Sequence, residues 1–302
     1  MKPNLSTTLQ QILLDTEKET HWSRSRQSLK RVKQMVNDAP PVRSFRRALS
    51  SGSALIAEIK ERSPSQGRML RENFRQAPHA YKESRIVRAI SVLTNRTHFG
   101  QEMRIEKLAR MRDVTSKPVL RKDFITDEYQ VYQSRAHGAD AILLMANILN
   151  AEELRRLSDL AFEIGLDVLF ETHCLADLED LPENAVMIGI NCRNFNSKPS
   201  QFRMAKLLRQ WLWAQSDRSV NPARFEYASQ LPSNAIKIAE SGVTAKNCAN
   251  VFAMGFHCAL VGTSLLMDRR GVKAALEDFE EAIFRRKNSV AVSPALMKPS
   301  LA

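Results

Sequence analysis

Cysteine is scarce in this sequence, and its pattern excludes two kinds of small structural domain. The 302 residues include four cysteines, none of them in a CxxC pair: Cys174, Cys192, Cys248 and Cys258. His173 and His257 each adjoin one cysteine, but a single neighbour does not supply the ligand spacing of a structural zinc site. We therefore expect free thiols in a reducing compartment, which favours a cytoplasmic protein without a disulfide framework or a bound metal.

Long apolar runs are also missing. The longest, such as residues 141–146, fall far short of the roughly 20 residues that a membrane-spanning helix requires. The first residues lack the charged stretch followed by an apolar core that is typical of a secretory signal. The sequence therefore predicts no membrane partner.

Acidic residues are the minority charge. The chain has 45 Lys and Arg against 33 Asp and Glu, a net charge of +12. Basic residues interleaved with aromatic ones, which stack on bases, are not found, nor is a recognised nucleic-acid-binding motif. We interpret the excess as a solvated basic face that steers small polyanions such as sugar phosphates, and we expect no specific nucleic-acid partner.

Eight short apolar runs are the main positive feature, and segments with helical spacing separate most of them. The runs cover residues 54–60, 89–94, 118–122, 139–145, 167–171, 186–191, 235–240 and 258–262. Alternating strands and helices predict βαβ units and a parallel sheet. Eight in succession predict an α/β protein with a closed (β/α)8 TIM barrel. The hydrophobic fraction of 43% is sufficient to fill its interior.

Three regions are expected along the chain. Residues 1–50 form an N-terminal helical extension that packs on the barrel, with helices starting near Leu5, over about residues 24–36 and over 44–49. Residues 51–287 form the catalytic barrel, in which a helix over 204–213 and an insertion up to about 224 separate strands six and seven. Residues 288–302 have two prolines and no periodicity, so we expect a disordered tail.

Most of the apolar runs end in a chemically active residue, and a TIM barrel carries its active site at the carboxyl ends of its strands. Lys60, Lys122, Glu171, Asn191 and Glu240 occupy those positions. Glu58 lies two residues before Lys60, so both side chains point to the same face of the first strand. Because a barrel has no exposed strand edge, an inward Glu and Lys indicate function rather than a surface ion pair.

The third strand leaves a choice open. Arg121 and Lys122 point to opposite faces, and the alternation of faces alone does not select one of them. Leu120 is the better inward residue for packing, which favours Lys122 at the mouth of the barrel. An ion pair between Lys122 and Asp123 is the competing interpretation.

Carboxylates and glycines complete the set at the later strands. An ionised Glu171 after an apolar strand is costly unless it is paired, and a lysine at the mouth is the natural partner. Mutual desolvation would bring one member of such a pair toward neutrality, as acid–base catalysis requires. Gly242 and Gly262 follow strands seven and eight, where exposed backbone N–H groups and the helices that start there predict a phosphate site.

Seven motifs, in order, resemble indole-3-glycerol phosphate synthase over roughly residues 5–268. They are AEIKERSPS (57–65), ISVLT (90–94), PVLRKDFI (118–125), GADAILL (138–144), GINCRNF (189–195), AESGV (239–243) and LVGTSLL (260–266). That family closes the indole ring of 1-(2-carboxyphenylamino)-1-deoxyribulose 5-phosphate with loss of CO2 and water. The resemblance implies a lyase of tryptophan biosynthesis that binds a small sugar-phosphate substrate, uses no cofactor or metal, and is a monomer or weak dimer.

The resemblance also implies roles for individual residues. Lys122 matches the general acid that protonates the substrate ketone during ring closure. Lys60 matches the lysine that pairs with the substrate carboxylate, with a less firmly assigned part in dehydration, and Glu171 matches the acid–base group of later proton transfers. The other matching polar residues of the catalytic centre are Glu58, Asn191, Glu240 and Ser241. Substrate-binding matches are Ser63, Gly242, Gly262, Thr263 and Ser264 for the phosphate, Arg193 beside the pocket, and Phe99, Phe124, Leu143 and Phe195 for the aromatic ring.

Three departures and two alternatives accompany this prediction. The family's Phe-x-Gly-Ser loop after strand two reads FGQE at 99–102, strand two begins with RIVR at 85–88, and the segment 211–233 is longer than usual. Phosphoribosylanthranilate isomerase is an alternative barrel enzyme, but it uses a Cys and an Asp, and the first strand here ends in Glu and Lys instead. A non-catalytic barrel that binds RNA or a protein is the second, and it would predict lost active-site residues.

Overall fold

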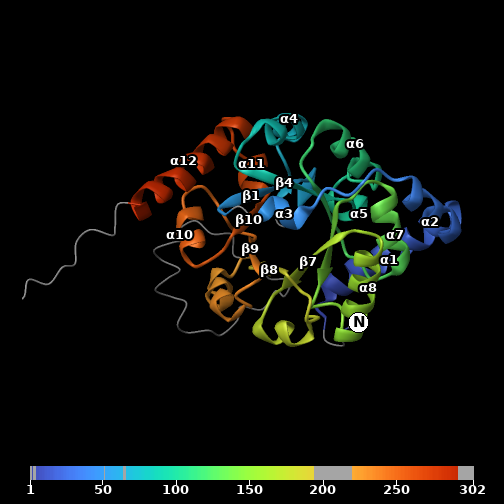
Figure 1. Ribbon diagram of the computed structural model, residues 1–302. Coiled ribbons are helices and arrows are strands. Elements are labelled where there is room, and N and C mark those ends of the chain that lie inside the picture. Colours follow the sequence, from blue (N-terminus) through green and yellow to red (C-terminus); the bar gives the residue numbers. More distant parts are fainter. Residues whose placement is uncertain (1, 3–4, 51, 64–65, 194–219, 292–302) are drawn as a thin grey trace, which may run out of the picture.

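Eight parallel strands form a closed barrel surrounded by helices in the computed structural model of the chain (Figure 1). The structure describes residues 2, 5–50, 52–63, 66–193 and 220–291. The barrel strands are β1 (Ala54–Ile59), β4 (Val87–Leu93), β5 (Val119–Lys122), β6 (Ala141–Met145), β7 (Asp167–Thr172), β8 (Met187–Asn191), β9 (Ile236–Glu240) and β10 (Cys258–Val261). Each pairs with its neighbour in the chain, and β1 closes the ring by pairing with both β4 and β10. The predicted TIM barrel is confirmed.

Helices follow the strands around the outside of the barrel. They are α4 (Arg71–Glu83), α5 (Arg96–Phe99), α6 (Glu106–Val114), α7 (Glu128–Ala136), α8 (Ala151–Glu163), η1 (Leu175–Asp180), η2 (Pro222–Gln230), α10 (Cys248–Ala253), α11 (Thr263–Leu266) and α12 (Val272–Ala291). A short hairpin of β2 (Arg62–Ser63) and β3 (Gly67–Arg68) follows β1. None of these or the N-terminal helices is, within the described residues, long and apolar enough to cross a membrane.

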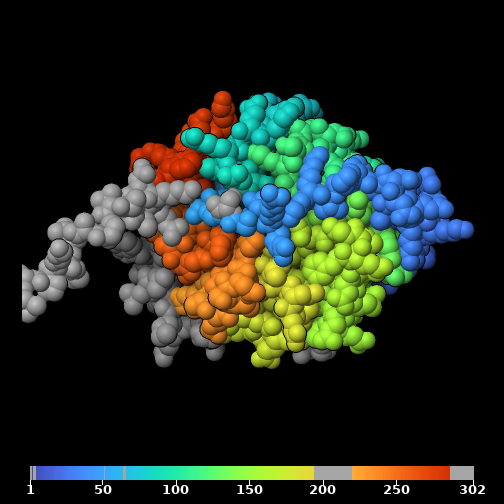
Figure 2. Space-filling model, in the orientation of Figure 1, coloured from blue at the N-terminus to red at the C-terminus, as the bar shows by residue number. Residues whose placement is uncertain are grey.

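The N-terminal extension consists of α1 (Thr7–Arg26), α2 (Leu29–Asp38) and α3 (Phe45–Leu49). Leu9, Ile12 and Leu13 of α1 are buried, as the spacing predicted. The expected start of the second helix near residue 24 is wrong, because α1 continues to Arg26. Ser28 then caps α2 by accepting a hydrogen bond from the backbone of Arg31. Figure 2 shows this segment in blue against the green residues of the barrel's outer helices, and α2 packs on α7.

Two regions expected from the sequence, the tail after residue 287 and the helix over 204–213, lie partly or wholly outside the described residues. Helix α12 reaches Ala291, four residues beyond the expected end of the barrel region at 287, and residues 292–302 lie outside the described part. The helix expected over 204–213 also lies outside it.

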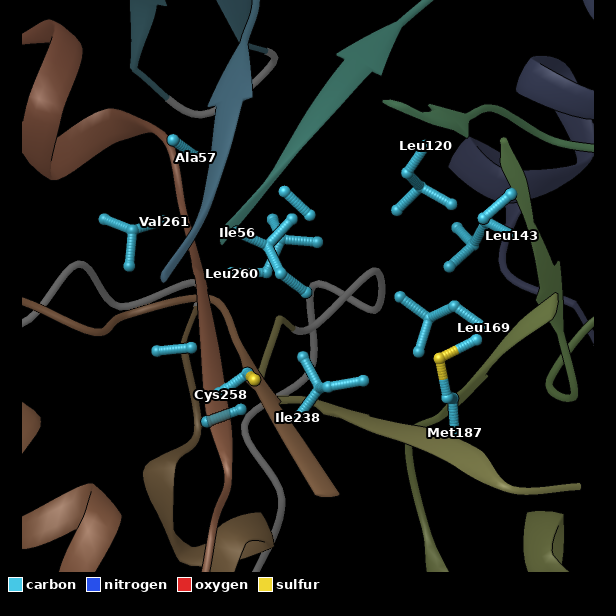
Figure 3. Close-up of a cluster of buried hydrophobic side chains, with 14 of the residues drawn as sticks. Ile56, Ala57, Leu120, Leu143, Leu169, Met187, Ile238, Cys258, Leu260 and Val261 are labelled. Carbon is cyan, nitrogen blue, oxygen red and sulfur yellow. The ribbon is translucent and has the colours of Figure 1, made fainter. Parts of the chain in front are cut away.

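A cluster of buried apolar side chains lies on the barrel strands (Figure 3). Leu120, Leu169 and Ile238 are completely buried there, on β5, β7 and β9. Since side chains alternate along a strand, the residues two places further on point the same way, into the mouth. Those residues are Lys122, Glu171 and Glu240.

Candidate active site

The first charged pair at the mouth comes from the end of β1. Lys60 Nζ lies 2.6 Å from Glu58 Oε1, and both side chains are buried. Burial opposes ionisation of Glu58, but the charges of Lys60 and Lys122 outweigh it and hold the pKa of that carboxyl below its usual value. Tyr81 of α4 donates its hydroxyl to the backbone oxygen of Glu58 and so fixes the strand end from outside. The pair is therefore a rigid, charged feature of the mouth.

Lys122 occupies the centre of a second charged group. Its Nζ lies 3.0 Å from Glu171 Oε2 and 3.5 Å from Glu240 Oε2. Burial alone would lower the pKa of Lys122, but the carboxylates of Glu171, Glu240 and Glu58 raise it above its ordinary value. The lysine is accordingly held as an ammonium ion, with a proton available in the mouth.

The structure resolves the choice that strand parity left open. Lys122 faces the mouth, whereas Arg121 points outward, beneath α7, and donates to the backbone oxygen of Gln130. Arg121 Nη2 also lies 2.9 Å from Asp123 Oδ2. The alternative ion pair between Lys122 and Asp123 is wrong, because Asp123 shares the outward face of Arg121.

Glu171 and Glu240 titrate as a coupled pair. Desolvation would raise the pKa of Glu171, but Lys122 and His173 lower it to about 2. Desolvation and the neighbouring Glu171 charge instead raise the pKa of Glu240 well above its usual value. Neither side-chain oxygen of Glu240 has a hydrogen-bond partner within the described part of the chain. Two adjacent carboxyls with opposite protonation preferences can hold one proton between them.

Two glycines make room for these carboxylates. A Cβ added to Gly262 would lie 2.5 Å from Glu58 Oε1 and 3.1 Å from Glu58 Cβ. A Cβ on Gly189 would overlap Glu240 Oε1. The sequence assigned Gly262 to the phosphate site only, and its contact with Glu58 was missed because it joins β10 to β1 across the closure of the barrel.

The expected phosphate-binding residues lie in the loops after β1, β9 and β10. Ser63 is buried and its Oγ accepts from the backbone of Gln66. Ser264 Oγ donates to the backbone oxygen of Val243 at 2.8 Å, which ties the loop after β10 to the loop after β9. Ser241 and Gly242 both have left-handed backbone conformations, with φ of 68° and 76°. A non-glycine residue in this conformation is strained and often belongs to a functional site.

The helices expected next to this loop pair are weaker than the sequence suggested. Helix α11 begins at Thr263, directly after Gly262, but it has only four residues. The helix after Gly242, α10, begins only at Cys248. Backbone N–H groups, rather than two long helix dipoles, are therefore the donors that these loops offer.

The apolar residues expected to hold the substrate's aromatic ring lie in different places. Phe99 and Phe124 stack with nearly parallel rings, 6.4 Å between centroids. Leu143 is buried in the barrel interior with the core side chains of Figure 3. Phe195 lies outside the described residues.

Sequence reasoning missed His173 as part of the site. It lies two residues after Glu171, so it shares the inward face of β7, and the same parity argument could have found it. The side chain is buried, and its Nε2 lies 3.5 Å from Glu171 Oε1. Desolvation lowers the pKa of His173 to about 4 against the opposing pull of Glu171, so the imidazole is neutral at pH 7.

Comparison with known proteins decides the family. A family model described as indole-3-glycerol phosphate synthase matches residues 9–209. The chain belongs to the indole-3-glycerol phosphate synthase family. A relative of that name from Bacteroides thetaiotaomicron is 33% identical over 263 residues, covering 85% of this chain and 92% of the relative. One from Koribacter versatilis is 36% identical over 269 residues, covering 87% of this chain and 95% of the relative.

Solved structures show the same fold at low identity. The 3-hexulose-6-phosphate synthase of Salmonella typhimurium has a TM-score of 0.55 at 14% identity and covers 77% of this chain and 99% of its own. A thiamine phosphate pyrophosphorylase from Pyrococcus furiosus has a TM-score of 0.53 at 15% identity, with 77% and 96% covered. These likenesses support the barrel architecture only.

Helix α5, which leads into the loop where this member of the synthase family departs from the usual motif, is held by the N-terminal helix α1. Asn95, the N-cap of α5, donates from Nδ2 to Thr16 Oγ1 of α1 at 3.2 Å. Thr97 Oγ1 donates to Glu19 of the same helix at 2.8 Å. Because α5 ends in Phe99, the extension supports one partner of the Phe99–Phe124 stack.

A second unpredicted residue, Arg224, holds the end of β8. Its Nη1 donates to the backbone oxygens of Asn191 and Arg193, at 3.0 and 2.8 Å. Asn191 Oδ1 accepts in turn from the backbone of Arg193 at 2.9 Å. None of the sequence motifs includes Arg224, which follows the long connection after β8.

Proposed function

We propose that this protein is a carboxy-lyase of tryptophan biosynthesis that closes the indole ring of 1-(2-carboxyphenylamino)-1-deoxyribulose 5-phosphate to give indole-3-glycerol phosphate. One observation carries the proposal beyond family membership. A protonated lysine, Lys122, lies between Glu171 and Glu240, beside the Glu58–Lys60 pair. A water-poor mouth with two cations and three carboxylates suits a reaction that needs an acid, an anion partner and a base.

Ring closure is the task of Lys122. The aromatic carbon that bears the carboxylate attacks the ketone carbon, and a new C–C bond forms while the ketone oxygen takes a proton from Lys122 Nζ. The raised pKa of Lys122 keeps that proton in place until negative charge develops on the oxygen. A general acid in this position typically contributes about 10²–10⁴-fold to the rate.

Decarboxylation and dehydration follow. Lys60 pairs with the substrate carboxylate, which leaves as CO2 when its C–C bond breaks and returns the electron pair to the ring system. The hydroxyl then leaves as water with a proton from an acid, while a base removes the proton that restores the aromatic indole. Glu171 serves these proton transfers, because its low pKa keeps it a carboxylate that can take up the proton leaving the ring. That proton can then pass to Lys122 and restore its ammonium form.

The remaining residues bind and orient the substrate. Ser241, Asn191 and Glu240 position its polar groups, and Arg193 lies beside the pocket. The phosphate is held by Ser63, Gly242, Gly262, Thr263 and Ser264, and the aromatic ring by Phe99, Phe124, Leu143 and Phe195. The protein works in the cytoplasm, as a monomer or weak dimer, on this small sugar phosphate.

Indole fluorescence tests the proposal directly. Purified protein mixed with the carboxyphenylamino-deoxyribulose phosphate should produce an emission rise as the indole forms. Binding of the substrate without any rise would overturn the synthase function. Complementation of a tryptophan auxotroph is the second experiment. Growth of cells that carry the gene would show that the protein serves the tryptophan pathway, and lack of growth would indicate a specialised indole pathway.

A further inference from the structure

The carboxylate of Glu171 has a different neighbour on each of its two oxygens. Oε2 faces Lys122 Nζ at 3.0 Å, and Oε1 faces His173 Nε2 at 3.5 Å. All three side chains are nearly removed from solvent. The imidazole is thus the second neighbour of the carboxylate, at a separation longer than an ordinary hydrogen bond, and Oε1 has no hydrogen-bond partner among the described residues.

We propose that His173 is a positioning residue for the reaction: its Nε2–H holds Oε1 of Glu171, which orients the carboxylate toward Lys122 and stabilises its ionised form. The proposal rests on the synthase function above for its kinetic consequences. Its structural part, the control of Glu171 by His173, does not depend on which substrate is bound.

The backbone around His173 supports this role. The amide N–H of His173 donates to Asp177 Oδ2 at 2.7 Å, and that of Cys174 donates to the same oxygen at 3.1 Å. Asp177 is itself buried in η1. This double contact fixes the turn that follows β7, so the imidazole is presented to Glu171 by a held backbone. The 3.5 Å between Nε2 and Oε1 is long for a hydrogen bond, and catalytic hydrogen bonds commonly shorten when substrate binds.

Burial favours a neutral imidazole in this place, and the charges around the ring act in both directions. Glu171 and Asp177 favour protonation of His173, while Lys122 of β5 and Arg224 of η2 oppose it together with burial. Around Glu171, the groups are Lys122, His173 and, from β9, Glu240. A neutral ring donates one N–H without adding a second cation, so Lys122 stays the only charged acid that faces Glu171 among the described residues.

Three substitutions separate this role from simple packing. In H173Q the amide nitrogen reaches about as far as Nε2, in H173N it reaches only as far as Nδ1, and in H173L the donor is lost. We expect H173L and H173N to raise the pKa of Glu171 by about one unit, a tenfold change in its protonation equilibrium. H173Q should keep the value close to that of the unsubstituted protein.

The readout is the carbon NMR signal of the Glu171 carboxyl in protein labelled with ¹³C-glutamate, identified by its loss in E171Q. Because Glu171 and Glu240 titrate together, the curve is fitted for the pair. An unchanged curve in both H173L and H173N, with folding verified by thermal unfolding, would overturn the proposal. So would a shift in H173Q as large as that in H173L.

Kinetics supply the second test. The acid limb of kcat should move to higher pH in H173L and H173N and return in H173Q, while KM stays within about twofold. A rise in KM with no change in the pH profile of kcat would refute a positioning role. If the unsubstituted protein does not act on the substrate, the synthase function fails while the NMR titration still decides the role of His173.

Discussion

The carboxylate of Glu58 fills the space beside the α-carbon of Gly262, where an added methyl group would lie 2.5 Å from Glu58 Oε1. The two residues lie on β1 and directly after β10, neighbouring strands at the closure of the barrel. The position of Glu58, and with it that of Lys60, depends on the absence of a side chain at residue 262.

A Gly262→Ala substitution should therefore damage the site more than the fold. We expect it to push Glu58 away from Lys60 and to lower kcat/KM by at least about tenfold, since small misplacements of reacting groups carry large rate penalties. Steady-state kinetics by indole fluorescence measures this. Gly255→Ala is the control: Gly255 has φ of 95° and open space around it. That variant should lose roughly 1 kcal/mol of stability and keep its activity.

Removal of the ammonium group of Lys122 should abolish most of the activity. We expect Lys122→Met to lower kcat by about 10²–10⁴-fold, because the general acid is lost while the methionine keeps much of the side-chain volume. Lys18→Met is a matched control on an exposed lysine of α1. A loss of less than tenfold in Lys122→Met would show that another group protonates the ketone.

Glu240→Gln should make the protein more stable at alkaline pH while lowering its activity. The pKa of Glu240 is raised in the folded state, so the folded protein binds a proton that the unfolded chain has released, and stability falls as pH rises toward that folded pKa. Glutamine removes this loss. A gain of about 1 kcal/mol would raise Tm by roughly 2–4 °C near pH 8, with the difference shrinking toward pH 4. Thermal unfolding across this range checks it, and a lower Tm in the variant at pH 8 contradicts it.

The contact between α1 and the loop after β4 should appear in substrate affinity. Asn95→Ala removes both the cap of α5 and the hydrogen bond to Thr16. We expect a loss of about 1 kcal/mol in stability, as for other N-caps, and a several-fold rise in KM, because Phe99 at the end of α5 loses its support. Ser28→Ala removes a comparable cap from α2, so it should cost similar stability without changing KM. Equal KM values in the Asn95→Ala and Ser28→Ala variants would show that the contact between α1 and α5 does not affect substrate binding.

The spacing of apolar residues along the sequence, and the alternation of side chains along each strand, were sufficient to predict most of the fold. Buried parallel strands read as short apolar runs, and each of the eight runs overlaps a barrel strand. The same alternation of side chains placed Glu58 and Lys60 on the inner face. Local hydrogen bonds set the remaining helix boundaries: Ser28 caps the start of α2 soon after α1 ends at Arg26. The spacing of apolar residues does not reveal such a cap.

The contacts that the sequence did not yield join residues far apart in the chain. Gly262 meets Glu58 across about two thirds of the chain, and Arg224 reaches back to Asn191 from η2. Such pairings depend on barrel closure and on loop paths, neither of which leaves a periodic signal. The pKa values of Glu171 and Glu240 differ for the same reason, since two identical side chains acquire opposite preferences only from their positions around Lys122.

The residues directly before and directly after residues 194–219 pair with each other through their backbones. Arg193 forms an antiparallel bridge with Val220, and the amide of Asn221 donates to the backbone oxygen of Cys192 at 2.7 Å. Because these ends are fastened to each other, the position of Asn191 at the mouth does not depend on how many residues lie between them. The length of this connection is therefore a feature that can change, by evolution or by design, without moving Asn191.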